Sequence, residues 1–225
     1  MKITALKPRR KCLTGVQFDT YIDPKELCAE TDAAGLIALD SELCDIEHLK
    51  AGSEISDEYL VSLIEQSHIK RAKSRAMWYL SHSSYPKAAL IKKLSAAFPS
   101  YAAEAAADRM EELGFINDAD YANRRLQVLI HDKGMSLKAA VYTLGTEGVD
   151  REVLSVAAEE AESEYDPAAA VTEIYERKYK SRLHSKKDFD RMIAGFVRKG
   201  FSAQFVLRTL RETDEEIEGF CNTEF

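Results

Sequence analysis

Residues 137–157 read LKAAVYTLGTEGVDREVLSVA, and their spacing predicts two helices joined by a tight turn. Apolar residues recur at i, i+3, i+4 and i+7, which places them on one face of a helix: Leu137, Ala140, Val141 and Leu144. Gly148 interrupts the pattern at the position of a C-terminal cap. A second apolar face follows, formed by Val153, Val156 and Ala157.

The same pattern occurs three times along the chain. Gly200-Phe201-Ser202 repeats the turn Gly148-Val149-Asp150 at an offset of 52 residues. The ends of the middle helices, Leu94, Leu144 and Phe196, are 50 and 52 residues apart. Such a period indicates a helical repeat, whose small units stabilise one another by stacking. We therefore predict a mainly α fold of tandem three-helix repeats that form an elongated, curved array.

The predicted organisation has five parts. Residues 1–55 form an N-terminal lead-in with short strands near Ile3–Leu6, Val16–Phe18 and Gly35–Leu39, because apolar and polar residues alternate there. Asp23-Pro24 predicts the start of a short helix that continues through Cys28. The repeats occupy residues 56–115, 116–164 and 165–213, and an acidic tail occupies residues 214–225.

Composition narrows the class of protein. Of 225 residues, 45% are apolar and 31% are charged, as in a folded chain, and no apolar run approaches the roughly 20 residues that a membrane span needs. The N-terminus lacks the apolar stretch of a signal peptide, which predicts a cytoplasmic protein without membrane contact. The four cysteines and five histidines are scattered, so neither a metal site nor a disulfide framework is predicted.

Sequence motifs of catalysis are missing. The chain has no phosphate-binding glycine loop, no H-E-x-x-H and no G-x-S-x-G. The carboxylates of Asn117-Asp118-Ala119-Asp120 are explained as the N-terminal cap of a helix, where negative charge is favoured. We therefore expect a protein that is not an enzyme and needs no cofactor.

Charge is distributed in alternating blocks. Residues 69–98 carry seven basic and no acidic side chains, and residues 177–211 carry eleven basic and two acidic ones. Residues 99–176, between them, carry six basic and 17 acidic side chains, and the whole chain has a net charge of -7. This pattern predicts a polarised molecule that meets a polyanion or an acidic protein groove with only some of its faces.

The basic blocks supply the candidate binding residues. In the first block these are Lys70, Arg71, Lys73, Arg75, Lys92 and Lys93. In the second block they are Arg177, Lys178, Lys180, Arg182, Lys186, Lys187, Arg191, Arg198 and Lys199. Trp78 and Tyr79 follow the first cations and could stack bases, but a place in the core is the favoured interpretation for both rings.

Residues 114–122, GFINDADYA, resemble a motif of the RecX family, the regulators of the bacterial recombinase RecA. The resemblance continues through residues 50–211, and its motif positions are Gly114, Asp118, Tyr121, Ala122, Gly134, Leu144, Gly148, Gly200 and Phe201. In the first repeat the chain departs from the family pattern. His82, Pro86 and Ala89-Leu90 replace the usual arginine, capping hydroxyl and Glu-Leu pair, so any partner contact that the family makes through that arginine or glutamate lacks its residue here.

The resemblance implies a monomeric, non-enzymatic modulator that lies along the RecA filament on single-stranded DNA and restrains its ATPase, strand-exchange and coprotease activities in DNA repair and the SOS response. We hypothesise that the basic first and third repeats contact the filament, whereas the acidic middle repeat chiefly sets their spacing. Three alternatives stay open: a module that binds nucleic acid directly without RecA, a scaffold for an unrelated partner, and a hydrolase with a dispersed catalytic cluster. The resemblance leaves room for weak direct DNA binding beside the filament contact.

Overall fold

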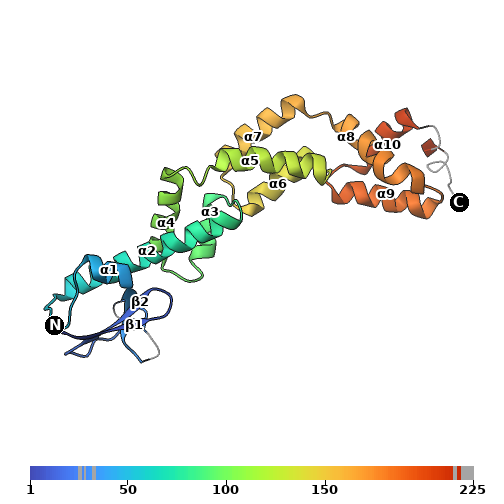
Figure 1. The fold of residues 1–225 in the computed structure, drawn as a ribbon. Coiled ribbons are helices and arrows are strands. Elements are labelled where there is room, and N and C mark those ends of the chain that lie inside the picture. Colours follow the sequence, from blue (N-terminus) through green and yellow to red (C-terminus); the bar gives the residue numbers. More distant parts are fainter. Residues whose placement is uncertain (25–26, 28, 32–33, 215–216, 219–225) are drawn as a thin grey trace. The chain divides into compact units, whose positions relative to one another are not determined.

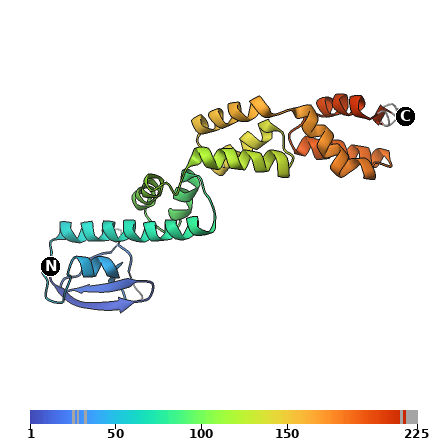
Figure 2. The same ribbon diagram turned by 45° about the horizontal axis from the view of Figure 1, so that its top comes forward.

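The computed structural model describes residues 1–24, 27, 29–31, 34–214 and 217–218 and divides the chain into two compact units. The first unit comprises Met1–Ile116 and the second Asn117–Phe225. Each unit contains two buried hydrophobic clusters of its own. Figures 1 and 2 show that helices dominate both units and that the sheet lies at the beginning of the first.

The first unit begins with a three-stranded antiparallel sheet, as the alternating apolar residues predict. Strands β1 (Ile3–Arg9), β2 (Leu13–Phe18) and β3 (Ile37–Asp40) lie in the order β1-β2-β3. Helix α1 (Ser41–Ile46) follows, and the Asp40 carboxylate caps it by accepting a hydrogen bond from the Leu43 N–H. The short helix predicted through Cys28 lies outside the described residues, because residues 25, 26 and 28 are not among them.

One long helix connects the two cores of the first unit. Helix α2 (Asp57–His82) begins at the predicted position, where the Ser56 hydroxyl accepts a hydrogen bond from the Tyr59 N–H. Its first half buries Leu60 and Leu63 against the sheet. Its second half buries Ala72 and Ala76 with residues of α3 (Lys87–Leu94) and α4 (Ser100–Glu112).

The second unit opens with three helices. These are α5 (Asp118–Gln127), which continues as the π-helical turn η1 (Val128–Asp132), α6 (Leu137–Glu147) and α7 (Arg151–Glu164). Asn117 caps α5 as predicted, because its side chain accepts a hydrogen bond from the Asp120 N–H. Leu126 and Leu144 are buried between the helices with Ala122, so the predicted apolar faces of α5 and α6 do form a core.

Three longer helices follow in the described part of the second unit. Helix α8 (Pro167–Ile174) continues as the π-helical turn η2 (Tyr175–Tyr179) and the short helix η3 (Lys180–Arg182). Helices α9 (Lys186–Arg198) and α10 (Ala203–Thr213) follow, each capped by a serine. Phe196 and Phe201 pack edge to face in the core that these helices share, with ring centroids 6.0 Å apart.

A close backbone approach joins these two sets of helices. The Ser136 N–H donates a hydrogen bond to the Lys199 carbonyl over 2.8 Å, and the Lys199 ammonium donates one to the Lys133 carbonyl. Gly200 has a φ of 91°, and a Cβ at this position would overlap Ala139 and lie 2.5 Å from the Ser136 Oγ. Glycine is therefore required here by both conformation and space.

The expected mainly helical fold with a small N-terminal sheet is confirmed. The boundaries of the individual repeats stay a prediction. One detail is wrong: Val156, expected on a buried face of α7, is 58% exposed, and Leu154 is buried in its place. Of the acidic tail, residues 215–216 and 219–225 lie outside the described residues, and Cys221 is among them.

Candidate partner interface

The cations of the first basic block divide into two groups in the structure. Lys70 forms ion pairs with Asp40 and Glu42, at 3.3 and 3.0 Å, and Arg71 pairs with Glu30 at 2.9 Å. These pairs attach α2 to the N-terminal sheet region, so Lys70 and Arg71 serve the fold. Lys73 and Arg75, farther along α2, and Lys92 and Lys93 on α3 are not in any of the ion pairs that the described residues make.

Arg75 and Lys93 build a cluster of cations and aromatic rings at the end of α2. The Arg75 guanidinium lies 4.9 Å from the centroid of the Trp78 ring and 5.3 Å from that of Tyr79. The Lys93 ammonium lies 5.4 Å from the Tyr79 centroid and 4.9 Å from that of Tyr85. Each contact is within the range of a cation–π attraction. We call these five residues the aromatic–basic cluster.

The two neighbouring aromatic rings near the end of α2 have different environments. Tyr79 is half-buried against the core of the first unit, as predicted, but Trp78 is 51% exposed and the neighbouring Met77 is 43% exposed. The core interpretation of Trp78 is therefore wrong. Sequence reasoning missed Tyr85 of the cluster and Met77, which lies beside the tryptophan within an acid-free segment.

The remaining basic side chain of α3 has a structural role. Lys87 contacts Asp108 and Glu111 of α4, both at 2.7 Å. Its hydrogen bonds to the two carboxylates raise the pKa of the Lys87 ammonium. This residue therefore ties α3 to α4 and does not belong to the aromatic–basic cluster.

Three cations of the second basic block line one hollow of the second unit. Lys178, Arg182 and Arg191 line it together with Tyr179, Leu183, Asp188 and Met192, and it encloses about 270 Å³. Arg191 also pairs with Asp188 at 3.5 Å, and the Lys178 ammonium lies 5.3 Å from the Tyr179 centroid. The structure thus brings together three predicted cations from η2, η3 and α9.

Other cations of this block make internal contacts. Arg177 pairs with Glu173 at 3.2 Å and Lys180 with Asp214 at 3.4 Å. Burial, reinforced by the nearby Lys178 and Arg177, lowers the pKa of Lys199, which serves the junction described above. The exposed residues Lys186 and Lys187 begin α9, and Arg198 is exposed at its other end.

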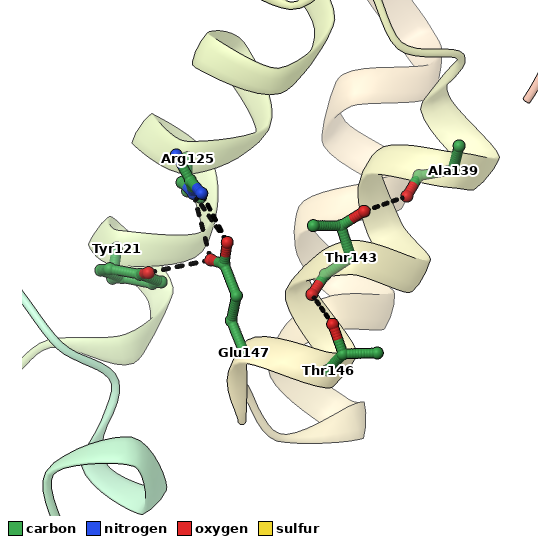
Figure 3. Close-up of polar contacts among 6 residues, drawn as sticks. All are labelled: Tyr121, Arg125, Ala139, Thr143, Thr146 and Glu147. Carbon is green, nitrogen blue, oxygen red and sulfur yellow. Dashed lines mark hydrogen bonds and ion pairs between the residues drawn. The ribbon is translucent and has the colours of Figure 1, made fainter. Parts of the chain in front are cut away.

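The motif positions of the second unit support its fold. Tyr121 and Arg125 of α5 converge on Glu147 of α6 (Figure 3). The Arg125 guanidinium donates to Glu147 through Nη2 at 2.5 Å and Nε at 3.1 Å, and the Tyr121 hydroxyl donates over 2.9 Å. Burial and the bond to Glu147 raise the pKa of Tyr121 to about 12, whereas Arg125 lowers the pKa of Glu147. The motif residue Tyr121 is therefore part of a polar bridge between two helices.

The remaining motif residues have comparable roles. Gly114, Gly134 and Gly148 adopt the left-handed conformation at turns, and Ala122, Leu144 and Phe201 are buried. Asp118 lies in the first turn of α5, beside the capping Asn117. Among the described residues, no group of three or more histidine, cysteine or acidic side chains could hold a metal ion. No helix in this part of the chain is long and apolar enough to span a membrane.

Comparison with known proteins gives one consistent result. No protein-family model matches the chain. A regulatory protein RecX of Thermus thermophilus is 32% identical over 147 residues, which cover 64% of this chain and 94% of that protein. A second, from Streptomyces coelicolor, is 31% identical over 120 residues, and the chain spans only 63% of its length. A third, from Clostridioides difficile, is 25% identical over 179 residues, or 78% of this chain and 84% of that protein.

Solved structures share the fold. A crystal structure of a regulatory protein RecX superimposes with a TM-score of 0.58 at 16% identity, covering 94% of this chain and 98% of that one. The RecX of Lactobacillus salivarius superimposes with a TM-score of 0.51 at 19% identity, covering 64% and 96%. The extent of the Thermus match, together with these folds, shows that the chain belongs to the RecX family of regulatory proteins.

Proposed function

We propose that this chain is a non-enzymatic regulator that binds the RecA filament on single-stranded DNA and restrains its ATPase, strand-exchange and coprotease activities. Membership of a regulatory family supports the class of function. The aromatic–basic cluster is the single observation that carries the proposal. It acts, on this view, in the cytoplasm during DNA repair and the SOS response.

The composition of the aromatic–basic cluster, together with the neighbouring Met77, suits a protein interface. Tryptophan, tyrosine, methionine and arginine are enriched where proteins bind one another, and such residues supply most of the binding energy. Trp78 and Met77 are exposed beside Arg75, and residues 69–98 contain no acidic side chain that would neutralise the surface. An acidic protein groove would complement it.

Helix α9 adds a second contact surface. Lys186 and Lys187 occupy its first turn, where positive charge opposes the helix dipole. The Lys186 ammonium lies 4.9 Å from the Phe189 centroid, and both lysines are exposed. Because positive charge in the first turn does not stabilise the helix, we assign these two lysines a role in binding the partner.

Direct binding of nucleic acid is the second candidate function. An exposed tryptophan beside cations is the arrangement that stacks bases and contacts phosphates. The net charge of -7 opposes tight binding to a polyanion. A regulator that also contacts the DNA of the filament would bind that DNA weakly through the aromatic–basic cluster.

The decisive experiment measures the ATPase rate of the cognate RecA on single-stranded DNA while this protein is titrated. A fall in rate at substoichiometric protein supports the proposal, provided that the protein binds DNA weakly in a control without RecA. Salt-sensitive binding to DNA without any effect on RecA supports the second candidate. If neither DNA binding nor inhibition is seen, both candidates fail and a scaffold for another partner remains.

Charge reversal tests the surface on α9. The double variant Lys186→Glu/Lys187→Glu is expected to weaken filament binding, with a loss that shrinks as salt rises. Acidic residues in the first turn favour a helix, so unfolding of α9 would not explain that loss. Lys138→Glu/Arg151→Glu is the matched control, because these cations are exposed and lie outside both basic blocks. Equal binding of the two double variants would count against the α9 surface.

A further inference from the structure

Helices α5 and α7 of the second unit enclose a groove that the proposed function does not use. The two helices run side by side in both views (Figures 1 and 2). Three hollows of about 300, 190 and 260 Å³ follow one another between them and reach the start of α8. Neighbouring hollows share lining residues, namely Asn123, Ala157 and Glu160, then Gln127, Ala161 and Glu164. They therefore form one continuous groove.

The floor of the groove is apolar because α7 presents small side chains there. Val153, Ala157 and Ala161 recur at i, i+4 and i+8, and the two alanines leave the space that larger residues would fill. Val156 lines the same groove and is 58% exposed. Its exposure, unexpected from the sequence, gives the groove an apolar anchor at one end.

The rim of the groove is acidic. Glu152, Glu160, Glu164, Asp166 and Glu173 line the three hollows, whereas Arg177, paired with Glu173, and His131 are the basic side chains among the lining residues. Glu160 accepts a hydrogen bond from Asn123 over 3.1 Å, which links the two walls. Phosphate groups would be repelled by such a rim, so nucleic acid is not the occupant.

We propose that this groove binds a basic amphipathic helix of a protein partner. From Glu152 to Glu164, α7 spans about 18 Å, which accommodates roughly three turns of a docked helix. An apolar stripe at i, i+4 and i+7 would lie on the alanines and on Val156, and flanking lysines or arginines would meet the glutamates. The middle repeat is then a binding surface in its own right, beyond the spacing role that its acidity suggested.

A second copy of this chain is a poorer occupant. Helices α9 and α10 are basic and amphipathic, but their apolar side chains, including Phe189, Met192 and Leu210, are buried in the core of the second unit. Neither helix could fill the groove without unfolding that core. We therefore assign the groove to a helix of another protein, and sedimentation of the free protein tests a second copy.

Fluorescence anisotropy with synthetic peptides tests the proposal on the full-length chain. The probe is a labelled helix of leucine and lysine with leucines at i, i+3, i+4 and i+7, and a scrambled peptide of the same composition is its control. The amphipathic peptide is expected to bind at least tenfold more tightly than the scrambled one. Equal binding of the two peptides, or no binding of either, would overturn the proposal.

Variants locate the binding site. Val156→Asp and Glu160→Lys/Glu164→Lys are each expected to weaken binding of the amphipathic peptide at least tenfold. Glu159→Lys/Glu162→Lys changes the same charge on exposed positions of α7 outside the groove and is expected to alter binding less than twofold. An equal loss of peptide binding in both double variants would mean that net charge alone explains the effect, and it would contradict the proposal.

Sedimentation of the protein without peptide tests whether a second copy of the chain occupies the groove. Self-association that Val156→Asp abolishes would assign the groove to a second copy and overturn the proposal. A monomer that binds the amphipathic peptide supports it. Neither result depends on RecA, so this proposal and the proposed function can fail separately.

Discussion

Trp78 is exposed because of its angular position on α2. It lies two residues, or about 200°, from Ala76, whose side chain is fully buried, so it faces away from the core. We predict that Trp78→Ala weakens inhibition of the RecA ATPase at least tenfold, since truncation of a central interface tryptophan commonly costs about 2 kcal/mol or more. Titration of the ATPase rate with each protein measures the loss.

Tyr142 provides the matched control for Trp78. It is also an exposed aromatic residue, at 75%, but it lies on α6 outside both basic blocks. Tyr142→Ala is expected to leave inhibition within twofold of the unmodified protein. Equal inhibition by Trp78→Ala and the unmodified chain would remove the cluster from the interface. The thermal midpoint of both variants should be unchanged, because neither ring fills a core.

The Glu147 bridge predicts a pH-dependent contribution to stability. Arg125 and the Tyr121 hydroxyl hold the pKa of Glu147 below the ordinary value of 4.5 in the folded state. The stabilisation is therefore fully present above the unfolded-state pKa and is lost as the pH falls through the lower folded-state pKa. We expect Glu147→Gln to cost about 1 kcal/mol near neutral pH and progressively less in acid.

Urea denaturation of both proteins across this pH range measures the difference in the free energy of unfolding. Glu173→Gln is the control, because the Glu173–Arg177 pair is mostly exposed and should contribute only a few tenths of a kcal/mol. A cost of Glu147→Gln that stays constant down to about pH 3 would show that the carboxylate charge is not what stabilises the fold.

At the scale of elements, the contact between α6 and the end of α9 requires glycine at position 200. Gly200→Ala would place a Cβ against Ala139 and Ser136 while holding alanine at a φ of 91°. We predict a loss of at least about 1–2 kcal/mol in the free energy of unfolding. Gly145→Ala is the control. Gly145 lies within α6, and a Cβ there would meet only the Leu154 side chain of α7, at 3.5 Å. Helix propensity there favours alanine, so this variant should be neutral or slightly stabilising in thermal melts.

The elements that sequence predicted well are those fixed by local signals. Asn117 caps α5 and Gly148 ends α6, both as expected, because a cap needs only neighbouring residues. The ion pairs of Lys70 and Arg71 could not be predicted in this way, since their acids lie 28 or more positions earlier in the chain. With Lys87, three of the seven cations in the acid-free block form ion pairs that hold the fold together.

Helix periodicity was least informative about which apolar residues stay exposed. Val156 and Trp78 both belong to stretches rich in apolar residues, and a stripe of 3.6-residue period does not say how far around the helix the core extends. That extent depends on the neighbouring helices, which the sequence does not place. Both exposed residues therefore emerged only from the structure, and both now define candidate binding surfaces.

Across the whole molecule, surfaces of opposite charge occur in different places. The aromatic–basic cluster belongs to the first unit, whereas the basic hollow beside η2 and the acidic groove between α5 and α7 belong to the second. Such a distribution explains how a chain of net charge -7 can still present cationic faces to a partner. Specificity then depends on which surfaces meet a partner together.

The division into two units predicts that inhibition of RecA weakens when the units are not covalently linked. Each unit has its own cores, so residues 1–116 and 117–225 produced separately should each unfold cooperatively in thermal melts followed by circular dichroism. If both basic surfaces contact one filament, the linked chain gains from effective concentration, and an equimolar mixture of the fragments should inhibit the RecA ATPase at least tenfold less well. Full potency of either folded fragment alone would mean that a single surface suffices, and a fragment without a cooperative transition would contradict the division into units.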